Sequence, residues 1–306
     1  MSTNVSLIKV LPWYDLREIL LTARKNFMKK LTAILSVLFY SSYAFSLTNS
    51  VMAESDQWSP VVQIKTDAPD ASGESIPGYC NATFVGKNVI ITAAHCLLLA
   101  YVSKENLLEI ETGYYKYVTR PDGQRVRIGY ALKNRFQKHV NIELPQSLID
   151  KISRRGAKTK IGPSEDFAIA WWNEETPEIA DMKFSPLVSP TEHTQISRTL
   201  KSFPLQVVSV NLFSVTTMDT KRMAALDKVS WSGGYIHSQS TARVEEGDSG
   251  APVFVTVNNQ QKLFAVVKGR ATTVFSNWDV YPSVTPHLCD INKKMPSHLK
   301  LAACAQ

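Results

Sequence analysis

Two short segments of the sequence carry residues that together could cleave an acyl bond. Thr92-Ala93-Ala94-His95-Cys96 offers an imidazole beside a cysteine, and Gly247-Asp248-Ser249-Gly250 offers a serine between two glycines. A serine hydroxyl is a weak nucleophile near neutral pH. It needs an imidazole to take its proton, a carboxylate to orient the imidazole, and backbone N–H groups to hold the oxyanion. The sequence contains a candidate for each role.

Ser249 is the candidate nucleophile, because Gly247 and Gly250 allow the sharp turn that exposes a serine between them. The N–H groups of Gly247 and Ser249 are the candidate oxyanion donors. His95 is the candidate general base. Of the six histidines, it is the one that ends a β-type run beside a cysteine.

The orienting carboxylate is sought among the aspartates that follow His95. Three lie between His95 and Asn173: Asp122, Asp150 and Asp166. Asp122 stands in a Pro-Asp-Gly turn, and Asp150 stands in a polar stretch with weak helical spacing. Only Asp166 opens an apolar run, Phe167-Ala168-Ile169-Ala170-Trp171-Trp172, that is typical of a buried strand. Asp166 is therefore the predicted acid.

The elements that must position these residues are short strands. Runs rich in β-branched and aromatic residues recur along the chain, bounded by turn residues, and long helical patterns are few. This pattern favours an all-β sandwich or barrel. The clearest runs are 82–85, 89–92, 114–118, 125–130, 205–215, 251–257 and 263–267, with turns predicted at Gly86-Lys87-Asn88, Pro121-Asp122-Gly123 and Asn258-Asn259-Gln260-Gln261.

The front of the chain has the pattern of a signal peptide. Met28-Lys29-Lys30 is a basic start, Leu31 to Phe45 is an apolar run too short for a comfortable membrane span, and small residues follow. We expect Met28 to be the true start and residues 1–27 to be an upstream extension. Cleavage after Val51-Met52-Ala53 would start the mature chain near Glu54, and Ala44-Phe45-Ser46 is the second candidate. An uncleaved anchor is the alternative; either way the rest of the chain is exported.

Charge and composition narrow the class of protein. The formal net charge is +7, but residues 1–53 hold six basic residues against two acidic ones, so most of the excess lies at the front. This distribution argues against a nucleic-acid-binding face. We expect no metal, because closely spaced Cys or His ligand pairs are missing, and no cofactor. We also expect no stable membrane insertion after signal cleavage.

Four cysteines allow three disulfide pairings. The local pairing, Cys80 with Cys96 and Cys289 with Cys304, is the simplest. An oxidising compartment outside the cytoplasm permits it.

With these segments in view, the chain resembles the chymotrypsin/trypsin family of serine peptidases, as an exported, bacterial member. Val89 to Cys96 resembles the family's base motif, with Cys80 where the partner of the adjacent cysteine belongs. Asp166-Phe167-Ala168-Ile169-Ala170 resembles the acid segment, and 247–253 resembles the nucleophile loop. Asp279 to Val284 resembles the stretch before the C-terminal helix. The order His, Asp, Ser is the family's order.

The resemblance implies two six-stranded antiparallel β-barrels followed by a short C-terminal helix. Residues 54–182 would form the first barrel with His95 and Asp166, and residues 183–306 the second with Ser249. The implied activity is hydrolysis of peptide bonds in proteins or peptides through an acyl-enzyme on Ser249. The alternative is a catalytically silent homologue that binds proteins. An esterase of the α/β-hydrolase type fits poorly, because the Gly-x-Ser-x-Gly spacing is absent.

Three features depart from the family pattern. No Arg or Lys followed by Ile-Val-Gly-Gly precedes Trp58. The family's usual activation, in which cleavage creates a terminal amine that pairs with the aspartate at position 248, is therefore in doubt. Internal hydrogen bonds to Asp248 are the alternative. Glu245 stands where many members have a cysteine. The stretch from His95 to Asp166 is long for the family, which predicts an insertion, at 107–160, that could frame or cover the cleft.

The resemblance also places a primary specificity pocket, with Arg243 near its floor and Asp279 on its wall. A buried guanidinium would favour acidic substrate side chains, whereas Asp279 would favour basic ones. The two could instead pair and leave a neutral pocket, or Arg243 could lie on the surface. Lys268-Gly269-Arg270 is expected to form the edge that pairs with the substrate backbone.

Overall fold

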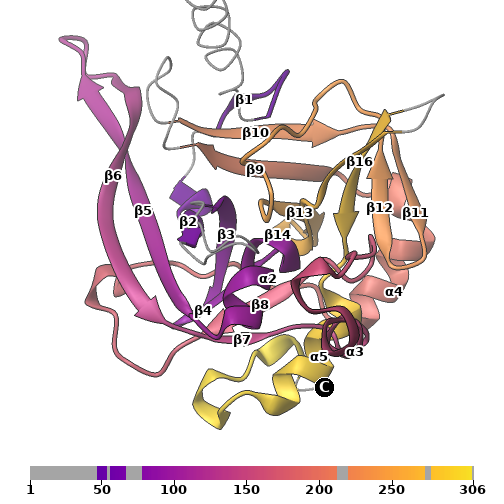
Figure 1. Cartoon of the computed structure of the whole chain (residues 1–306). Coiled ribbons are helices and arrows are strands. Elements are labelled where there is room, and N and C mark those ends of the chain that lie inside the picture. The colour runs from indigo at the N-terminus through magenta and orange to yellow at the C-terminus, as the bar shows by residue number, and fades with distance from the viewer. Residues whose placement is uncertain (1–46, 54–55, 67–77, 212–219, 273–276, 305–306) are drawn as a thin grey trace, which may run out of the picture. The chain divides into compact units, whose positions relative to one another are not determined.

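The computed structural model describes residues 47–53, 56–66, 78–211, 220–272 and 277–304. Of the leader predicted over residues 1–53, residues 1–46 lie outside the described part of the chain and residues 47–53 lie within it. From residue 45 onward the chain forms one compact unit built mainly of β-sheet (Figure 1). No helix in the described residues is long and apolar enough to cross a membrane.

The first half of the chain supplies a seven-stranded antiparallel sheet that curls into a half-barrel (Figure 1). Its strands, in spatial order, are β6 (Arg125–His139), β5 (Leu107–Thr119), β2 (Val61–Thr66), β3 (Gly78–Gly86), β4 (Val89–Thr92), β8 (Ala168–Trp171) and β7 (Asn141–Glu143). Helix α2 (Ala94–Ser103) follows β4, and α3 (Gln146–Arg155) follows β7.

The second half, together with β1 (Val51–Met52) from the start of the described chain, supplies two further antiparallel sheets. The five-stranded one runs β1, β10 (Thr220–Leu226), β9 (Leu205–Asn211), β13 (Pro252–Val257) and β14 (Gln260–Val266). The four-stranded one runs β11 (Val229–Ser232), β12 (Tyr235–Ser238), β16 (Asn277–Pro282) and β15 (Gly269–Thr272). Two helices complete this half, α4 (Pro190–Arg198) and α5 (Thr285–Lys294).

The fold is thus mostly β with a short helix near the C-terminus, as the sequence predicts. The described strands do not confirm two barrels of six strands each. They pair as sheets of seven, five and four strands, although a single bridge between Ala265 and Ser283 connects the latter two. The boundary between residues 182 and 183 stays a prediction. Every strand of the seven-stranded sheet precedes it, and apart from β1 every strand of the other sheets follows it.

Strands β4 and β8 are apolar except for Thr92 at the end of β4, because both of their faces pack against cores. Alternate residues of a strand point to opposite faces. Ile90 and Ala170 accordingly pack in the core of the first half. Val89 and Ile169 pack in a second core that also takes residues from β9, β13, β14 and α5. A third core lies within the second half.

The register of β4 and β8 explains why two distant segments meet. The strands are antiparallel, and Thr92 pairs with Ala168. His95 follows the end of β4 and Asp166 precedes the start of β8, so both lie at the same edge of the sheet. A slip of one residue would turn every side chain of the strand to the opposite face. The side chains would then no longer fit the core against which they pack, so the register is strongly specified.

Turn chemistry confirms two hairpins expected from the sequence. Asn258 and Asn259 join β13 to β14, and both have positive φ, as a two-residue type I′ turn requires. Gly123, also at positive φ, closes the β5–β6 hairpin, where the Asp122 carboxylate accepts the N–H of Gln124 at 2.9 Å.

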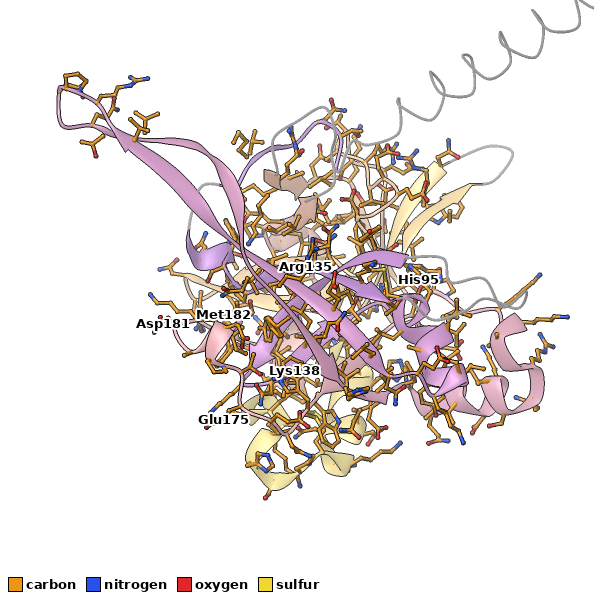
Figure 2. All side chains as sticks on the ribbon, turned by 60° about the vertical axis from the view of Figure 1, so that its left-hand side comes forward. His95, Arg135, Lys138, Glu175, Asp181 and Met182 are labelled. Carbon is orange, nitrogen blue, oxygen red and sulfur yellow. A yellow bond between two sulfur atoms is a disulfide. The ribbon has the colours of Figure 1, made fainter. Side chains whose placement is uncertain are left out.

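The β5–β6 hairpin is the main part of the predicted insertion. Strand β2 pairs with β5 only over 108–111, and the rest of the hairpin continues beyond the sheet as a two-stranded arm (Figures 1 and 2). At its base, Arg135 forms ion pairs with Glu109 and with the buried Glu111.

Both predicted disulfides are present, Cys80–Cys96 and Cys289–Cys304. The first ties β3 to the opening turn of α2, next to His95. The second ties α5 to the C-terminal tail. Two disulfides indicate an oxidising location outside the cytoplasm.

Candidate active site

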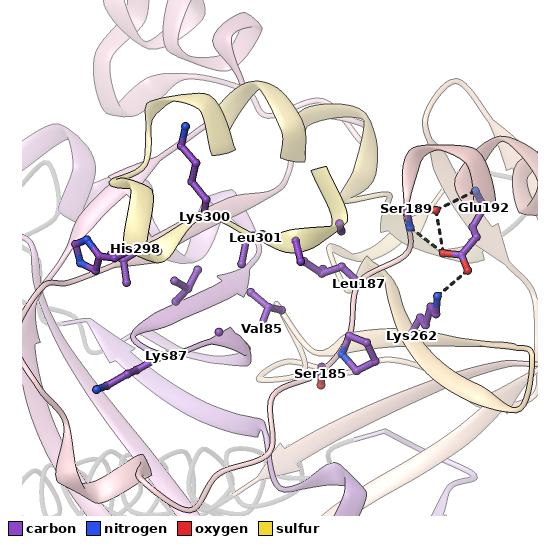
Figure 3. Close-up of a pocket in the computed structure, with 16 residues that line it drawn as sticks. Val85, Lys87, Ser185, Leu187, Ser189, Glu192, Lys262, His298, Lys300 and Leu301 are labelled. Atoms are coloured by element: carbon purple, nitrogen blue, oxygen red, sulfur yellow. Dashed lines mark hydrogen bonds and ion pairs between the residues drawn. The ribbon is translucent and has the colours of Figure 1, made fainter. Parts of the chain in front are cut away.

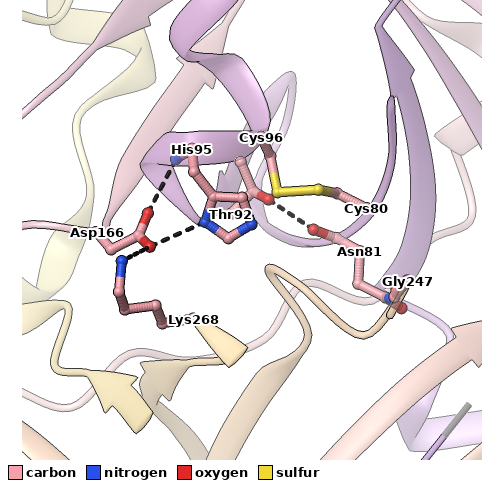
Figure 4. Close-up of a disulfide and its surroundings, with 8 residues drawn as sticks. All are labelled: Cys80, Asn81, Thr92, His95, Cys96, Asp166, Gly247 and Lys268. Carbon is pink, nitrogen blue, oxygen red and sulfur yellow. Dashed lines mark hydrogen bonds and ion pairs between the residues drawn. A yellow bond between two sulfur atoms is a disulfide. The ribbon is translucent and has the colours of Figure 1, made fainter. Parts of the chain in front are cut away.

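His95 and Asp166 form a hydrogen-bonded pair (Figure 4). His95 stands in the first turn of α2, where backbone N–H groups lack partners within the helix. Its N–H donates to Asp166 Oδ1 at 2.9 Å, and its Nδ1 lies 2.9 Å from Asp166 Oδ2. Ala93, at the N-cap position, has no side chain that can cap, so Asp166 caps the helix instead. The carboxylate therefore fixes both the backbone and the ring of His95.

Asp166 is buried completely, whereas the His95 side chain is 34% exposed. Burial by itself would raise the pKa of Asp166. The hydrogen bond from His95 and the charge of the Lys268 ammonium outweigh this and lower the pKa below its ordinary value. Asp166 is therefore ionised at neutral pH, as an orienting carboxylate must be. Among the described residues, the imidazole forms hydrogen bonds through Nδ1 and none through Nε2.

The loop that carries Ser249 packs against the strands next to His95. The N–H of Asn81, in β3, donates to Ser249 O at 2.6 Å, and its side-chain Nδ2 donates to Gly247 O at 2.8 Å. Thr92 Oγ1 in turn donates to Asn81 O at 2.6 Å. Asn81 is fully buried, and its Oδ1 accepts the N–H of Val210. This single side chain joins both halves of the molecule at the loop, and the sequence analysis did not identify it.

Gly250 has to be a glycine at this contact. Its φ is +77°, and a Cβ would lie 2.1 Å from Asn81 O and 2.2 Å from Thr92 Oγ1. The loop backbone therefore lies directly against the end of β4, three residues before His95.

Ser249 is half-buried. Within the described residues, no hydrogen bond joins its Oγ to the imidazole of His95. The roles of Ser249, His95 and Asp166 accordingly stay predictions, although the contacts between their segments are observed.

The hydrogen bonds of this loop leave two of its N–H groups without a partner among the described residues. The carbonyls of Gly247, Asp248 and Ser249 accept hydrogen bonds, and the N–H of Gly250 donates to Val267 O at 2.8 Å. In the described part of the chain, the N–H groups of Gly247 and Ser249 donate to no other group. Gly247 reaches this arrangement at φ +93°. These are the two N–H groups that the sequence analysis proposed.

Asp248 is held by internal hydrogen bonds, as one of the two alternatives expected. Its Oδ2 accepts the N–H of Glu245 and the N–H of Leu47, each at 2.8 Å, and its Oδ1 accepts the Ser209 hydroxyl at 2.5 Å. The carboxylate is fully buried. The contact with Leu47 comes from a segment that cleavage near Glu54 would remove with the leader.

The residues expected in the specificity pocket form a charged cluster. Arg243 Nη1 lies 4.0 Å from Asp279 Oδ2. Arg270 is the closer partner, with Nε 3.4 Å from Asp279 Oδ1 and Nη2 3.1 Å from Glu245 Oε1. Burial raises the pKa of Asp279, although the Val244 N–H and the two guanidinium groups act in the other direction. Arg243 Nη1 thus lies within ion-pair distance of Asp279 but has no hydrogen-bond partner among the described residues, and Gly269 begins the adjoining strand β15. The pocket itself stays a prediction.

Two other features lie beside this site. Helix α3 of the predicted insertion borders it, because Lys151 forms an ion pair with Glu165 at 2.5 Å, next to Asp166. The sulfurs of Cys80 and Cys96 lie close to the His95 ring, but in a disulfide they are not free to bind a metal.

A cavity of about 450 Å³ lies elsewhere and contains none of the candidate catalytic residues (Figure 3). The β3–β4 turn, the 185–189 segment and the C-terminal tail line it, with the Glu192–Lys262 ion pair at one side. We assign no role to this cavity.

Comparison with known proteins adds no relative: no protein-family model and no curated protein matches the chain.

Proposed function

We propose that the chain is an exported serine endopeptidase of the chymotrypsin/trypsin type. The observation that carries the proposal is the pair of hydrogen bonds from His95 to the buried Asp166, beside a loop that keeps two N–H groups unpaired next to Ser249. A structural histidine would not need a buried, ionised carboxylate on both its backbone and its ring.

In the proposed reaction, His95 Nε2 takes the proton of Ser249 as its Oγ attacks a substrate carbonyl carbon. Asp166 holds the ring and stabilises the imidazolium that forms. The N–H groups of Gly247 and Ser249 bind the oxyanion of the tetrahedral intermediate. His95 then donates its proton to the leaving amine, which leaves an acyl-enzyme on Ser249. Water, activated by His95, hydrolyses this ester and restores the serine.

The proposal is tested by covalent labelling. A fluorophosphonate probe should label the wild-type protein on Ser249, because only an activated serine reacts quickly with it. Ser249→Ala should not be labelled, whereas Ser232→Ala, which removes an exposed serine on β11, should react like the wild type. Mass spectrometry of the labelled peptide identifies the site. If the folded wild type stays unlabelled across pH 5–9, the peptidase proposal is wrong and the silent, protein-binding homologue is favoured.

The contacts of residues 47–53 favour the second of the two expected cleavage positions. Leu47 and Ala53 are buried, and Val51–Met52 pairs with β10. Cleavage near Glu54 would remove a strand and a partner of Asp248, whereas cleavage after Ser46 would turn the Leu47 N–H into an ammonium beside that carboxylate. A charge-assisted hydrogen bond is stronger than a neutral one.

We therefore expect the mature protein to begin at Leu47. N-terminal sequencing and intact mass of the protein, after export into a bacterial periplasm, measure this directly. A fully active product that begins at Glu54 would show that the β1 strand and the Leu47 contact are dispensable.

A further inference from the structure

Lys268 makes a contact with Asp166 that the sequence analysis did not foresee. It lies between β14 and β15, where we expected it only to border the substrate backbone. Its N–H donates to Val280 O at 2.9 Å, which fixes its backbone. Its Nζ lies 2.7 Å from Asp166 Oδ2 and 3.2 Å from Ile161 O. The side chain is only 26% exposed, so the ammonium is held in place rather than loosely tethered.

The ammonium and the imidazole share one oxygen. Asp166 Oδ2 is 2.9 Å from His95 Nδ1 and 2.7 Å from Lys268 Nζ. Two donors on one acceptor are close neighbours. When His95 is protonated, two positive charges therefore face a single carboxylate. At such separations, partly buried like charges repel appreciably.

The other charged or titratable groups described near Asp166 have other partners, including His287 of α5, whose Nε2 lies 2.9 Å from Ser164 O. On the preceding loop, Glu165 pairs with Lys151 of α3 and accepts the Gly162 N–H. On β15, Arg270 pairs with Asp279 and Glu245. Among the described residues, His95 on α2 and Lys268 are thus the charged or titratable groups in hydrogen-bond contact with Asp166. Without Lys268, the negative charge of Asp166 would act on the imidazole alone.

We propose that Lys268 is a positioning residue that sets the pH range of the reaction. It offsets the charge of Asp166, so His95 stays unprotonated, and able to act as a base, in more acidic surroundings than it would with neutral donors on that carboxylate. The same repulsion opposes the imidazolium of the transition state, so acid tolerance comes with a lower maximal rate. This inference rests on the proposed function only where it concerns catalysis.

The first test measures protonation of His95 without relying on activity. The titration of its ring protons is followed by NMR in the wild type, Lys268→Met and Lys268→Arg, with His95→Ala for assignment. We expect the midpoint in Lys268→Met to rise by about one pH unit relative to the wild type, and Lys268→Arg to keep the wild-type midpoint. Lys151→Met is the matched control, because it removes a lysine paired with the neighbouring carboxylate. Equal midpoints in wild type and Lys268→Met would overturn the inference.

The second test follows the rate of fluorophosphonate labelling from pH 4 to 9. The acidic limb of Lys268→Met should move to higher pH by the same amount, whatever its plateau rate, while Lys268→Arg and Lys151→Met keep the wild-type limb. A merely structural role would lower the plateau and leave the limb in place, which would contradict the inference. If Lys268→Met does not fold, Lys268→Gln replaces it. If no variant is labelled, the proposed function fails and the NMR midpoints still decide the inference.

Discussion

Replacing His95 with alanine is expected to lower kcat/KM by about 10⁴-fold or more while the protein stays folded. In the proposed mechanism, His95 is both the base for Ser249 and the acid for the leaving amine, so the variant lacks both functions. Ser249→Ala should lose a similar amount, since both residues serve the same step. The double variant should therefore be little worse than either single one.

The measurement is steady-state hydrolysis of a peptide library, which also reports the preferred substrate side chain. His139→Ala, at an exposed position on β6, is the control and should retain activity. Circular dichroism checks that each variant is folded. A His95→Ala protein with activity within tenfold of the wild type would remove His95 from the mechanism.

Asp166→Asn is expected to lower kcat by about 10⁴-fold, which is the loss typical of this exchange in a Ser-His-Asp triad. The carboxylate accepts the His95 N–H, the His95 ring and the Lys268 ammonium. An amide keeps only one oxygen. If the NH₂ group faces the ring, His95 Nδ1 can no longer donate its proton there and the ring adopts the other tautomer. If the NH₂ group faces the helix, α2 loses its N-terminal cap. Activity near the wild-type level would show that Asp166 has no orienting role.

The same variant should change how stability depends on pH. The pKa of Asp166 in the folded protein is lowered from its ordinary value. Its ionised form therefore stabilises the fold above the unfolded-state pKa, near 4, and this contribution is lost as the pH falls through the folded-state pKa. Urea unfolding between pH 3 and 7 should show the stability advantage of wild type over Asp166→Asn shrinking at the acidic end. A constant difference would contradict this reading.

Some helices were missed for identifiable reasons. Helix α2 begins right after a β-type run, and its leucine-rich sequence has no polar face that would reveal helical spacing. Helix α4 lies in the proline- and polar-rich stretch 177–199, whose composition is more typical of a linker than of a helix. There, Ser189 and Glu192 form a capping box directly before and within the first turn, a local signal that could have predicted it. Helix α3, in contrast, forms where the sequence around Asp150 has weak helical spacing.

The sequence by itself determined the features that depend on neighbouring residues. These are the strands 82–85 and 89–92, the hairpin turns at Gly123 and Asn258-Asn259, and both disulfides, which close loops of 16 and 15 residues. Such features depend on local backbone preferences and on the closure of short loops, so they can be predicted from one sequence. The choice of Asp166 over two other aspartates also came from its local context, a polar residue that opens a buried strand.

Only the tertiary structure decided which groups surround Asp166 and Asp248. The contacts of His95 and Lys268 with Asp166 span 71 and 102 residues, and that of Leu47 with Asp248 spans 201. They exist because the register of β4 with β8, and the packing of the two halves, brings particular ends of the chain together. No local pattern encodes such a register, since it is set by which faces of many strands are buried at once.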